Sequence, residues 1–516
     1  MLFLCSLCVA LSAALVQAVA DVTENIEVLA FLPQNNSYLF SSARVAPAVL
    51  YAQRRLEADA RFSGFRFNVH FEDSDCVNGA MFALVERACA RKPHLILGPV
   101  CEYEAAAVVR LASHWNVPVV SAGALAAGFS KKKTEYAQLT RIAPSYVKMG
   151  EIFAAMFERF DWRSALLVYE DDRQERNCFF TLEGIYHMLH DVDMKTYPLD
   201  DGVALDTDKL KSALILALRV TIIQLVIMCM PAEKIRELML AAHARQLTGG
   251  NHMFFNVDLF NASSYGNGSW KKGDKHDNNA KQAFAFLNTV TLLRTVKPEF
   301  EVFSEEMKAS VKKAEFQDCN DCADVNMFVE GFHDAVLLYA IALYEATKHG
   351  YSKRNGTEIT SRMWNRTFEG IAGPVSIDEN GDRNGDFSLI AMTNTSSGTY
   401  EVAPSRHWQL GGEAVANYFG GNGSFQLLPG ISADRFTLKG QRKPPPEITE
   451  KSCGLGVSAL TGVIVGAVLG AAMLITFYFI RKNYKITIER RTQAEECNTA
   501  KHRQLREDSI RSNFSV

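Results

Sequence analysis

The stretch HLILGPVCEYEAAAVVRLASHWNVPVVSAG, residues 94–123, holds the unit from which the fold can be inferred. Its first aliphatic run, residues 94–99, ends at Gly-Pro, and its last, residues 117–123, ends at a glycine. Short aliphatic runs bounded in this way are typical of β-strands. Between them, residues 101–115 carry apolar side chains three and four positions apart, which indicates a helix. Strand, helix and strand in this order predict parallel strands covered by the helix that joins them.

The same alternation extends through residues 21–440. Further strands are predicted at residues 26–33, 65–73, 165–171, 220–229 and 253–260. Further helices are predicted at residues 44–60, 146–160 and 232–246. Repeated units of this kind predict an α/β fold of doubly wound parallel sheets. Because a single core seldom grows to this size, two lobes are expected rather than one.

Apolar segments near both ends of the chain predict secretion and a membrane anchor. Residues 1–20 are uncharged and end in Ala-Val-Ala, which is typical of a cleaved signal peptide, the alternative being an uncleaved signal anchor. Residues 455–480 carry no charge and are long enough to cross a membrane as a helix. Arg481, Lys482 and Lys485 follow directly, which places residues 481–516 in the cytosol. Residues 441–454, with a triple proline, are the predicted stalk of a single-pass type I protein.

Composition agrees with an extracellular ligand-binding region. The formal net charge is -3 and 48% of residues are hydrophobic, so no excess of base indicates a nucleic-acid partner. Glycosylation acceptors of the form Asn-x-Ser/Thr all precede the predicted membrane helix. They are Asn35, Asn261, Asn267, Asn355, Asn365, Asn394 and Asn422.

Cysteines in an oxidising compartment are expected to form disulfides. The extracellular ones are Cys76, Cys89, Cys101, Cys178, Cys229, Cys319, Cys322 and Cys453. Spacing alone does not choose among their pairings. Cys453 lies in the stalk without an evident partner in its own chain, which favours a bond between two copies. Glycines at 462, 466 and 470 have the spacing that lets two membrane helices approach closely, and they favour the same dimer.

Catalytic motifs give no support for an enzyme. The sequence lacks GxSxG, GxxxxGK[ST] and HExxH. Residues 378–386, DENGDRNGD, resemble a calcium loop, but in either EF-hand register a required residue is wrong, so a hairpin turn is predicted. His333 and Asp334 are adjacent on a predicted helix and are expected to point in different directions, which favours core or interface packing over a catalytic pair. Neither a metal site nor an organic cofactor is predicted.

Several long segments of the chain carry a resemblance to one family. They are residues 97–115, 120–129, 175–184, 327–339, 362–392, 486–496 and 501–516. Together these segments resemble the natriuretic peptide receptor family, and within it the clearance type. The resemblance implies a two-lobed ectodomain like the type I periplasmic binding proteins. It also implies a plasma-membrane receptor that captures natriuretic peptides as a dimer, clears them by internalisation and couples to an inhibitory G protein.

The predicted cytosolic tail bears on these functions. Residues 481–516 are too few to house the kinase-like and cyclase domains of other family members. Basic clusters at residues 490–491 and 501–506 suit an acidic protein partner, or alternatively anionic lipid. A different class of function follows from the fold alone, namely a receptor whose two lobes close on a small molecule.

The resemblance also implies individual residue roles. It pairs Cys76 with Cys101 and Cys178 with Cys229, makes Cys453 the interchain cysteine, and places a chloride ion at Ser74, Val100 and Cys101. A turn with a solvated Ser74 is the alternative to the chloride site. The peptide-binding residues that it implies are Asn78, Tyr103, Arg110, Glu135, Tyr169 and Phe179. For these the alternatives are core packing of Tyr169 and Phe179 and surface charges at Arg110 and Glu135.

Overall fold

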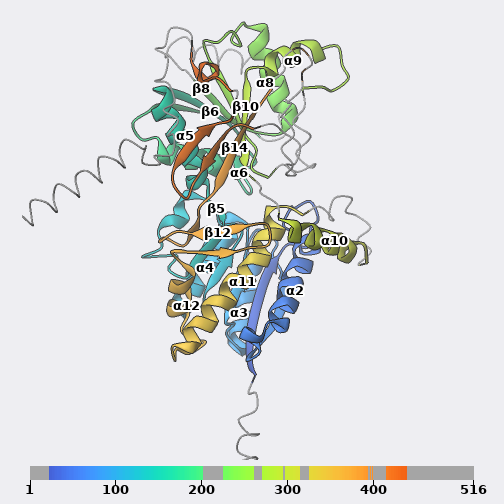
Figure 1. The fold of residues 1–516 in the computed structure, drawn as a ribbon, viewed down its shortest axis with the longest axis vertical. Coiled ribbons are helices and arrows are strands. Elements are labelled where there is room, and N and C mark those ends of the chain that lie inside the picture. Colours follow the sequence, from blue (N-terminus) through green and yellow to red (C-terminus); the bar gives the residue numbers. More distant parts are fainter. Residues whose placement is uncertain are drawn as a thin grey trace, which may run out of the picture. The chain divides into compact units, whose positions relative to one another are not determined.

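A computed structural model describes part of the predicted extracellular region (Figure 1). The residues described are 23–200, 225–260, 270–293, 297–313, 325–392, 396, 398, 414–429 and 431–438. The predicted signal peptide, stalk, membrane helix and tail lie outside these residues, as do Cys319, Cys322 and Cys453.

The first lobe is built on a sheet ordered β11-β12-β13-β5-β4-β3-β1-β2. Its parallel strands are β1 (Glu24–Leu32), β2 (Phe65–Asp73), β3 (Leu95–Leu97), β4 (Val119–Ser121) and β5 (Leu139–Pro144). The strands added at its edge are β11 (Arg366–Glu369), β12 (Pro374–Ile377) and β13 (Asp382–Arg383). Its helices are α2 (Ser42–Ala58), α3 (Gly79–Ala90), α4 (Glu102–Trp115), α10 (Pro298–Lys313), α11 (Met327–Lys348) and α12 (Gly356–Met363).

Both faces of this sheet are covered by helices. Successive strand side chains point to opposite faces. Accordingly, Leu29 and Phe31 of β1 pack with α3 and α4, whereas Val28, Ala30 and Leu32 pack with α2 and α11. Helix α11 is long and apolar enough to cross a membrane, and it is alone in this among the helices of the described ranges. Most of its side chains are buried in the lobe, so it is a core helix.

The second lobe repeats this plan with a sheet ordered β16-β15-β14-β10-β9-β8-β6-β7. Its parallel strands are β6 (Ser164–Asp171), β7 (Asp193–Asp200), β8 (Leu225–Cys229), β9 (Met253–Val257) and β10 (Leu287–Leu292). The antiparallel strands are β14 (Asp386–Ala391), β15 (Ala414–Phe419) and β16 (Ser424–Leu427). Its helices are α5 (Tyr146–Phe160), α6 (Asn177–Met188), α8 (Ala232–Ala244) and α9 (Asp277–Phe284). Helices α5 and α6 cover one face and α8 and α9 the other.

The connections between the lobes contain a predicted hairpin and a close approach of two chain segments. The hairpin predicted at residues 378–386 is confirmed, because β12 and β13 pair antiparallel across it. The chain then enters the second lobe through Gly385, where a Cβ atom would lie 2.6 Å from the side chain of Pro144. Pro144 ends β5, just before the chain first enters the second lobe at α5. A glycine is therefore required where these two connections touch.

Candidate ligand-binding surface

Each lobe has a disulfide at the carboxyl ends of its parallel strands. In the first lobe, Cys76 follows β2 and Cys101 follows β3, and the two are bonded. In the second, Cys178 at the start of α6 is bonded to Cys229 at the end of β8. These are the pairings that the resemblance implies. The strand order reverses beside β1 and beside β6, and ligands of open α/β sheets bind at the carboxyl ends of strands at such points.

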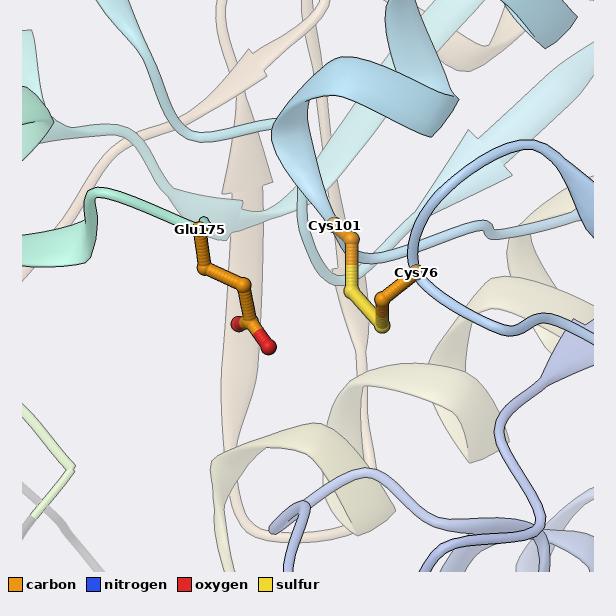
Figure 2. A group of neighbouring side chains, drawn as sticks. All are labelled: Cys76, Cys101 and Glu175. Atoms are coloured by element: carbon orange, nitrogen blue, oxygen red, sulfur yellow. A yellow bond between two sulfur atoms is a disulfide. The ribbon is translucent and has the colours of Figure 1, made fainter. Parts of the chain in front are cut away.

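Glu175 lies against the first of these disulfides (Figure 2). One of its carboxylate oxygens and the sulfur atoms of Cys76 and Cys101 lie within 4.8 Å of one another. A metal ion requires thiolates, and these sulfurs are bonded to each other, so the group is not a metal site. Glu175 precedes α6 of the second lobe and is hydrogen-bonded to Tyr38 of the first, so it joins the lobes. Burial raises the pKa of this carboxyl.

Four aromatic rings form a continuous group, called the aromatic cluster below, from α4 to β6. The ring centroids of Tyr103 and Phe180 are 5.7 Å apart, those of Phe180 and Phe179 5.3 Å, and those of Phe179 and Tyr169 5.8 Å. Tyr103 is 49% exposed and the other three are half-buried. Tyr169 and Phe180 also pack against the core, whereas Phe179 is not part of it. The alternative that both residues are core side chains is therefore correct in part for Tyr169 and wrong for Phe179.

Arg176 fixes the cluster from one side. Its guanidinium carbon lies 3.9 Å from the centroid of the Phe179 ring, close enough for a cation–π contact. Two hydrogen bonds of 2.9 and 2.7 Å hold the same group on Asp171, and it is also hydrogen-bonded to Tyr103. Phe180 and Arg176 were not among the predicted binding residues. The signal for them was their position in the segment 175–184, which carries the family resemblance.

The remaining predicted peptide-binding residues lie on the first lobe. Arg110, two turns beyond Tyr103 on α4, donates to the Glu135 carboxylate at 2.6 and 2.8 Å and stacks over the ring of Tyr136. Both charged side chains are about half exposed, so they are surface charges that neutralise each other. Asn78 is exposed and directly precedes α3. The structure thus joins Arg110 to Glu135 and Tyr169 to Phe179.

The predicted chloride ligands do not form a site that fits the ion. Ser74 is fully buried, which rules out the alternative of a solvated side chain. Its hydroxyl donates a hydrogen bond to the Glu104 carboxylate, which is fully buried too. A serine hydroxyl has one hydrogen to donate, and a carboxylate repels an anion at this range. The hydroxyl of Ser74 is therefore hydrogen-bonded to a carboxylate of the protein itself, that of Glu104.

A cavity of about 190 Å³ lies at the carboxyl ends of the first-lobe strands. Its lining includes the carboxylates of Glu102, Asp172 and Glu175 and the rings of Phe260 and Phe328. Pockets for small ligands usually measure roughly 300–1,000 Å³, so the size gives little support to a small-molecule receptor. Burial raises the pKa of Glu102 to about 7, although its carboxylate accepts backbone N–H bonds from Leu125 and Ala126.

His333 and Asp334 are packed in the core, but one reason given for that prediction was wrong. Their side chains do not point apart, because His333 Nδ1 lies 2.8 Å from Asp334 Oδ1. Asp334 also accepts the backbone N–H of Ile371 at 2.8 Å, and both residues are almost fully buried. The aspartate thus ties α11 to the loop after β11, which is a structural role.

Helix α3 presents apolar side chains to solvent. Phe82 is 58% exposed and Val85 is 41% exposed, and Cys89, one turn further along the helix, is exposed with a free thiol. Positions three and four apart lie on one side of a helix, so these three residues form an exposed stripe.

Of the predicted glycosylation acceptors, Asn35, Asn365 and Asn422 are exposed and Asn355 is half-buried as the N-cap of α12. Asn261, Asn267 and Asn394 lie outside the described residues.

Comparison with known proteins identifies the family. Residues 44–395 match the family described as "Receptor family ligand binding region". Atrial natriuretic peptide receptor 3 from Bos taurus is 53% identical over 510 residues, covering 96% of this chain and 91% of that protein. The receptor of the same name from Homo sapiens is 53% identical over 511 residues, with the same shares. Atrial natriuretic peptide receptor 2 from Homo sapiens is 30% identical over 403 residues, 74% of this chain and 37% of that protein. The chain belongs to the natriuretic peptide receptor family.

Proposed function

We propose that this chain is a non-enzymatic cell-surface receptor that binds natriuretic peptides. The observation that carries the proposal is the identity of 53%, over 96% of the chain, to receptors that bear the name of such a peptide. The aromatic cluster supports it, because exposed aromatic rings held beside an arginine are the composition of a binding hot spot. Tyr103 belongs to the first lobe and Phe179 to the second, so a peptide that lies on the cluster would contact both.

The receptor is proposed to bind one peptide between two copies of the chain. The exposed stripe on α3, formed by Phe82, Val85 and Cys89, supports this arrangement, since an unpartnered apolar helix face suits a second protein surface. Cys453 and the predicted membrane helix would hold the two copies together beside and within the membrane. The twofold arrangement would then offer two aromatic clusters to one peptide.

Clearance by internalisation and coupling to an inhibitory G protein are the proposed outcomes of binding. Both outcomes are proposed because the chain aligns with 91% of the human atrial natriuretic peptide receptor 3 but with only 37% of the human atrial natriuretic peptide receptor 2, so it is similar to the first over nearly its whole length. The basic clusters at residues 490–491 and 501–506 are the proposed contact with the G protein. The proposed location is the plasma membrane, with the N-terminus outside the cell.

Uptake of radiolabelled atrial natriuretic peptide tests the proposal. Cells that lack natriuretic receptors would express the full chain, and surface-bound and acid-resistant peptide would be counted separately. We expect saturable binding, one peptide per two chains, progressive uptake and unchanged cyclic GMP. Tyr103→Ala should weaken binding, whereas Tyr351→Ala, at a tyrosine 44% exposed outside the cluster, should not. Absence of saturable binding by chains shown to reach the surface would refute the proposed function.

A further inference from the structure

A buried carboxylate lies where the family resemblance implies an inorganic anion. Glu104 is in the first turn of α4, three residues after Cys101, and is fully buried. Its Oε2 accepts the Ser74 hydroxyl from the end of β2, and its Oε1 accepts the backbone N–H of Ala80 at 2.7 Å. One side chain therefore joins α4 to both ends of the loop that carries Cys76.

The surroundings of Glu104 hold its carboxylate with two hydrogen bonds and disfavour a second anion. The amino end of a helix stabilises an anion, and a buried charge is tolerated when it is hydrogen-bonded. Burial raises the pKa of Glu104, its hydrogen bonds with Ser74 and Ala80 act to lower that pKa, and the nearby carboxyl groups of Asp75 and Asp73 act to raise it. A chloride ion entering this space would meet three carboxyl groups and would have to take the Ser74 hydrogen from one of them.

We propose that the Glu104 carboxylate is a built-in anion that replaces a bound chloride ion in this chain. The loop of residues 74–80 is then held to α4 by a covalent part of the protein, and the folded state does not depend on chloride concentration. Removing the carboxylate would leave the Ser74 hydroxyl and the Ala80 N–H without an acceptor in a buried polar space, where a small anion would regain both bonds. A chloride requirement should therefore appear only when Glu104 is substituted.

The test measures thermal unfolding of the full chain in detergent at pH 8 and constant ionic strength, with sodium gluconate replaced stepwise by sodium chloride. This readout does not use peptide, so it succeeds or fails independently of the proposed function. The parent melting temperature should change by less than about 1 °C. Glu104→Ala should melt lower in gluconate and rise by about 2 °C or more with a saturable dependence on chloride.

Glu102→Ala is the matched control. Glu102 is a buried glutamate of the same helical turn whose carboxylate also accepts two hydrogen bonds, but both come from the backbone N–H groups of Leu125 and Ala126. This variant should be destabilised, and chloride should rescue it less than Glu104→Ala, because Glu102 lines a cavity that also holds the carboxylates of Asp172 and Glu175. Saturable stabilisation of the parent by chloride, or equal rescue of both variants, would overturn the proposal. Should Glu104→Ala fail to fold, Glu104→Ser also vacates the space between Ser74 and Ala80, and the absence of chloride stabilisation in that variant would also overturn the proposal.

Discussion

Asp382 is expected to be among the most sensitive charged residues for folding. It lies on β13 and is almost fully buried between two cations. Arg141 of β5 donates to it at 2.7 and 2.6 Å, and the Lys132 ammonium lies 3.0 Å from the same carboxylate. Burial alone would raise the pKa of Asp382, but these two cations hold it well below its usual range. The cluster fixes the edge strand β13 to the parallel part of the first sheet.

Asp382→Asn keeps the size of the side chain and removes its charge. The two buried cations would then lose the anion that they share, and breaking a buried ion pair in this way costs about 3–5 kcal/mol. Burial already lowers the pKa of Lys132 to about 8, so this lysine would lose its proton more readily and relieve part of the repulsion. We therefore expect a loss near the lower end of that range, about a hundredfold in the folding equilibrium.

Urea unfolding of the full chain in detergent, followed by tryptophan fluorescence, measures the loss. Glu379→Gln is the matched control, because it removes one negative charge from an exposed position of the same turn. It should leave the free energy of unfolding within about 0.5 kcal/mol of the parent. The double variant Lys132→Met/Asp382→Asn should recover part of the loss, as expected for groups that interact directly. If Asp382→Asn alone unfolds within 1 kcal/mol of the parent, charge pairing is not what stabilises this strand.

Three further predictions concern ligand, pH and assembly. Phe179→Ala should weaken peptide affinity by about 2–4 kcal/mol, thirtyfold or more, and affinity within threefold of the parent at the cell surface would make Phe179 a packing residue. Burial raises the pKa of Glu102 in the folded chain to about 7, above its usual value of 4.5. Between pH 7 and 4.5 the folded chain therefore binds a proton more readily than the unfolded chain, so the free energy of unfolding rises as the pH falls through this range. Thermal unfolding from pH 8 to 5 should show this rise in the parent and a smaller one in Glu102→Gln. Cys453→Ser should abolish the covalent dimer on a non-reducing gel and keep most peptide binding, whereas a surviving covalent dimer would implicate Cys89, Cys319 or Cys322.

The parallel part of the fold could largely be predicted from the sequence because most of its strands are short runs rich in β-branched, aliphatic or aromatic residues. The predicted strand at residues 65–73 coincides with β2, and the predicted helix at 146–160 coincides with α5. Strand β5 was not predicted, because Arg141 interrupts its apolar pattern. That arginine is tolerated in a buried strand only because Asp382, 241 positions further along the chain, neutralises it. A local pattern does not reveal such a partner.

The candidate site was predictable only in part, for a related reason. The family resemblance supplied Tyr103, Tyr169 and Phe179, but Phe180 and Arg176 join them only through contacts made in three dimensions. The chloride expectation did not take Glu104 into account, although the sequence held a signal. Glu104 lies four and eight positions before Val108 and Ala112, which places the three residues on one side of the helix. Val108 and Ala112 are fully buried, so the same spacing predicts that the Glu104 carboxylate is buried too.

The first turn of α4 explains how an exposed binding residue can be held in place. Tyr103 points to solvent, while its neighbours Glu102 and Glu104 point inward, because successive helical side chains diverge by about a quarter turn or more. Glu102 holds the turn to the backbone of residues 125–126, and Glu104 holds it to Ser74 and Ala80. The position of Tyr103 is thus fixed by two buried carboxylates on either side of it in the sequence. We therefore expect Glu104→Ala to lose peptide affinity, because Tyr103 is no longer held in place, and chloride to restore that affinity. Chloride should not restore peptide affinity to Tyr103→Ala, which lacks the binding side chain itself.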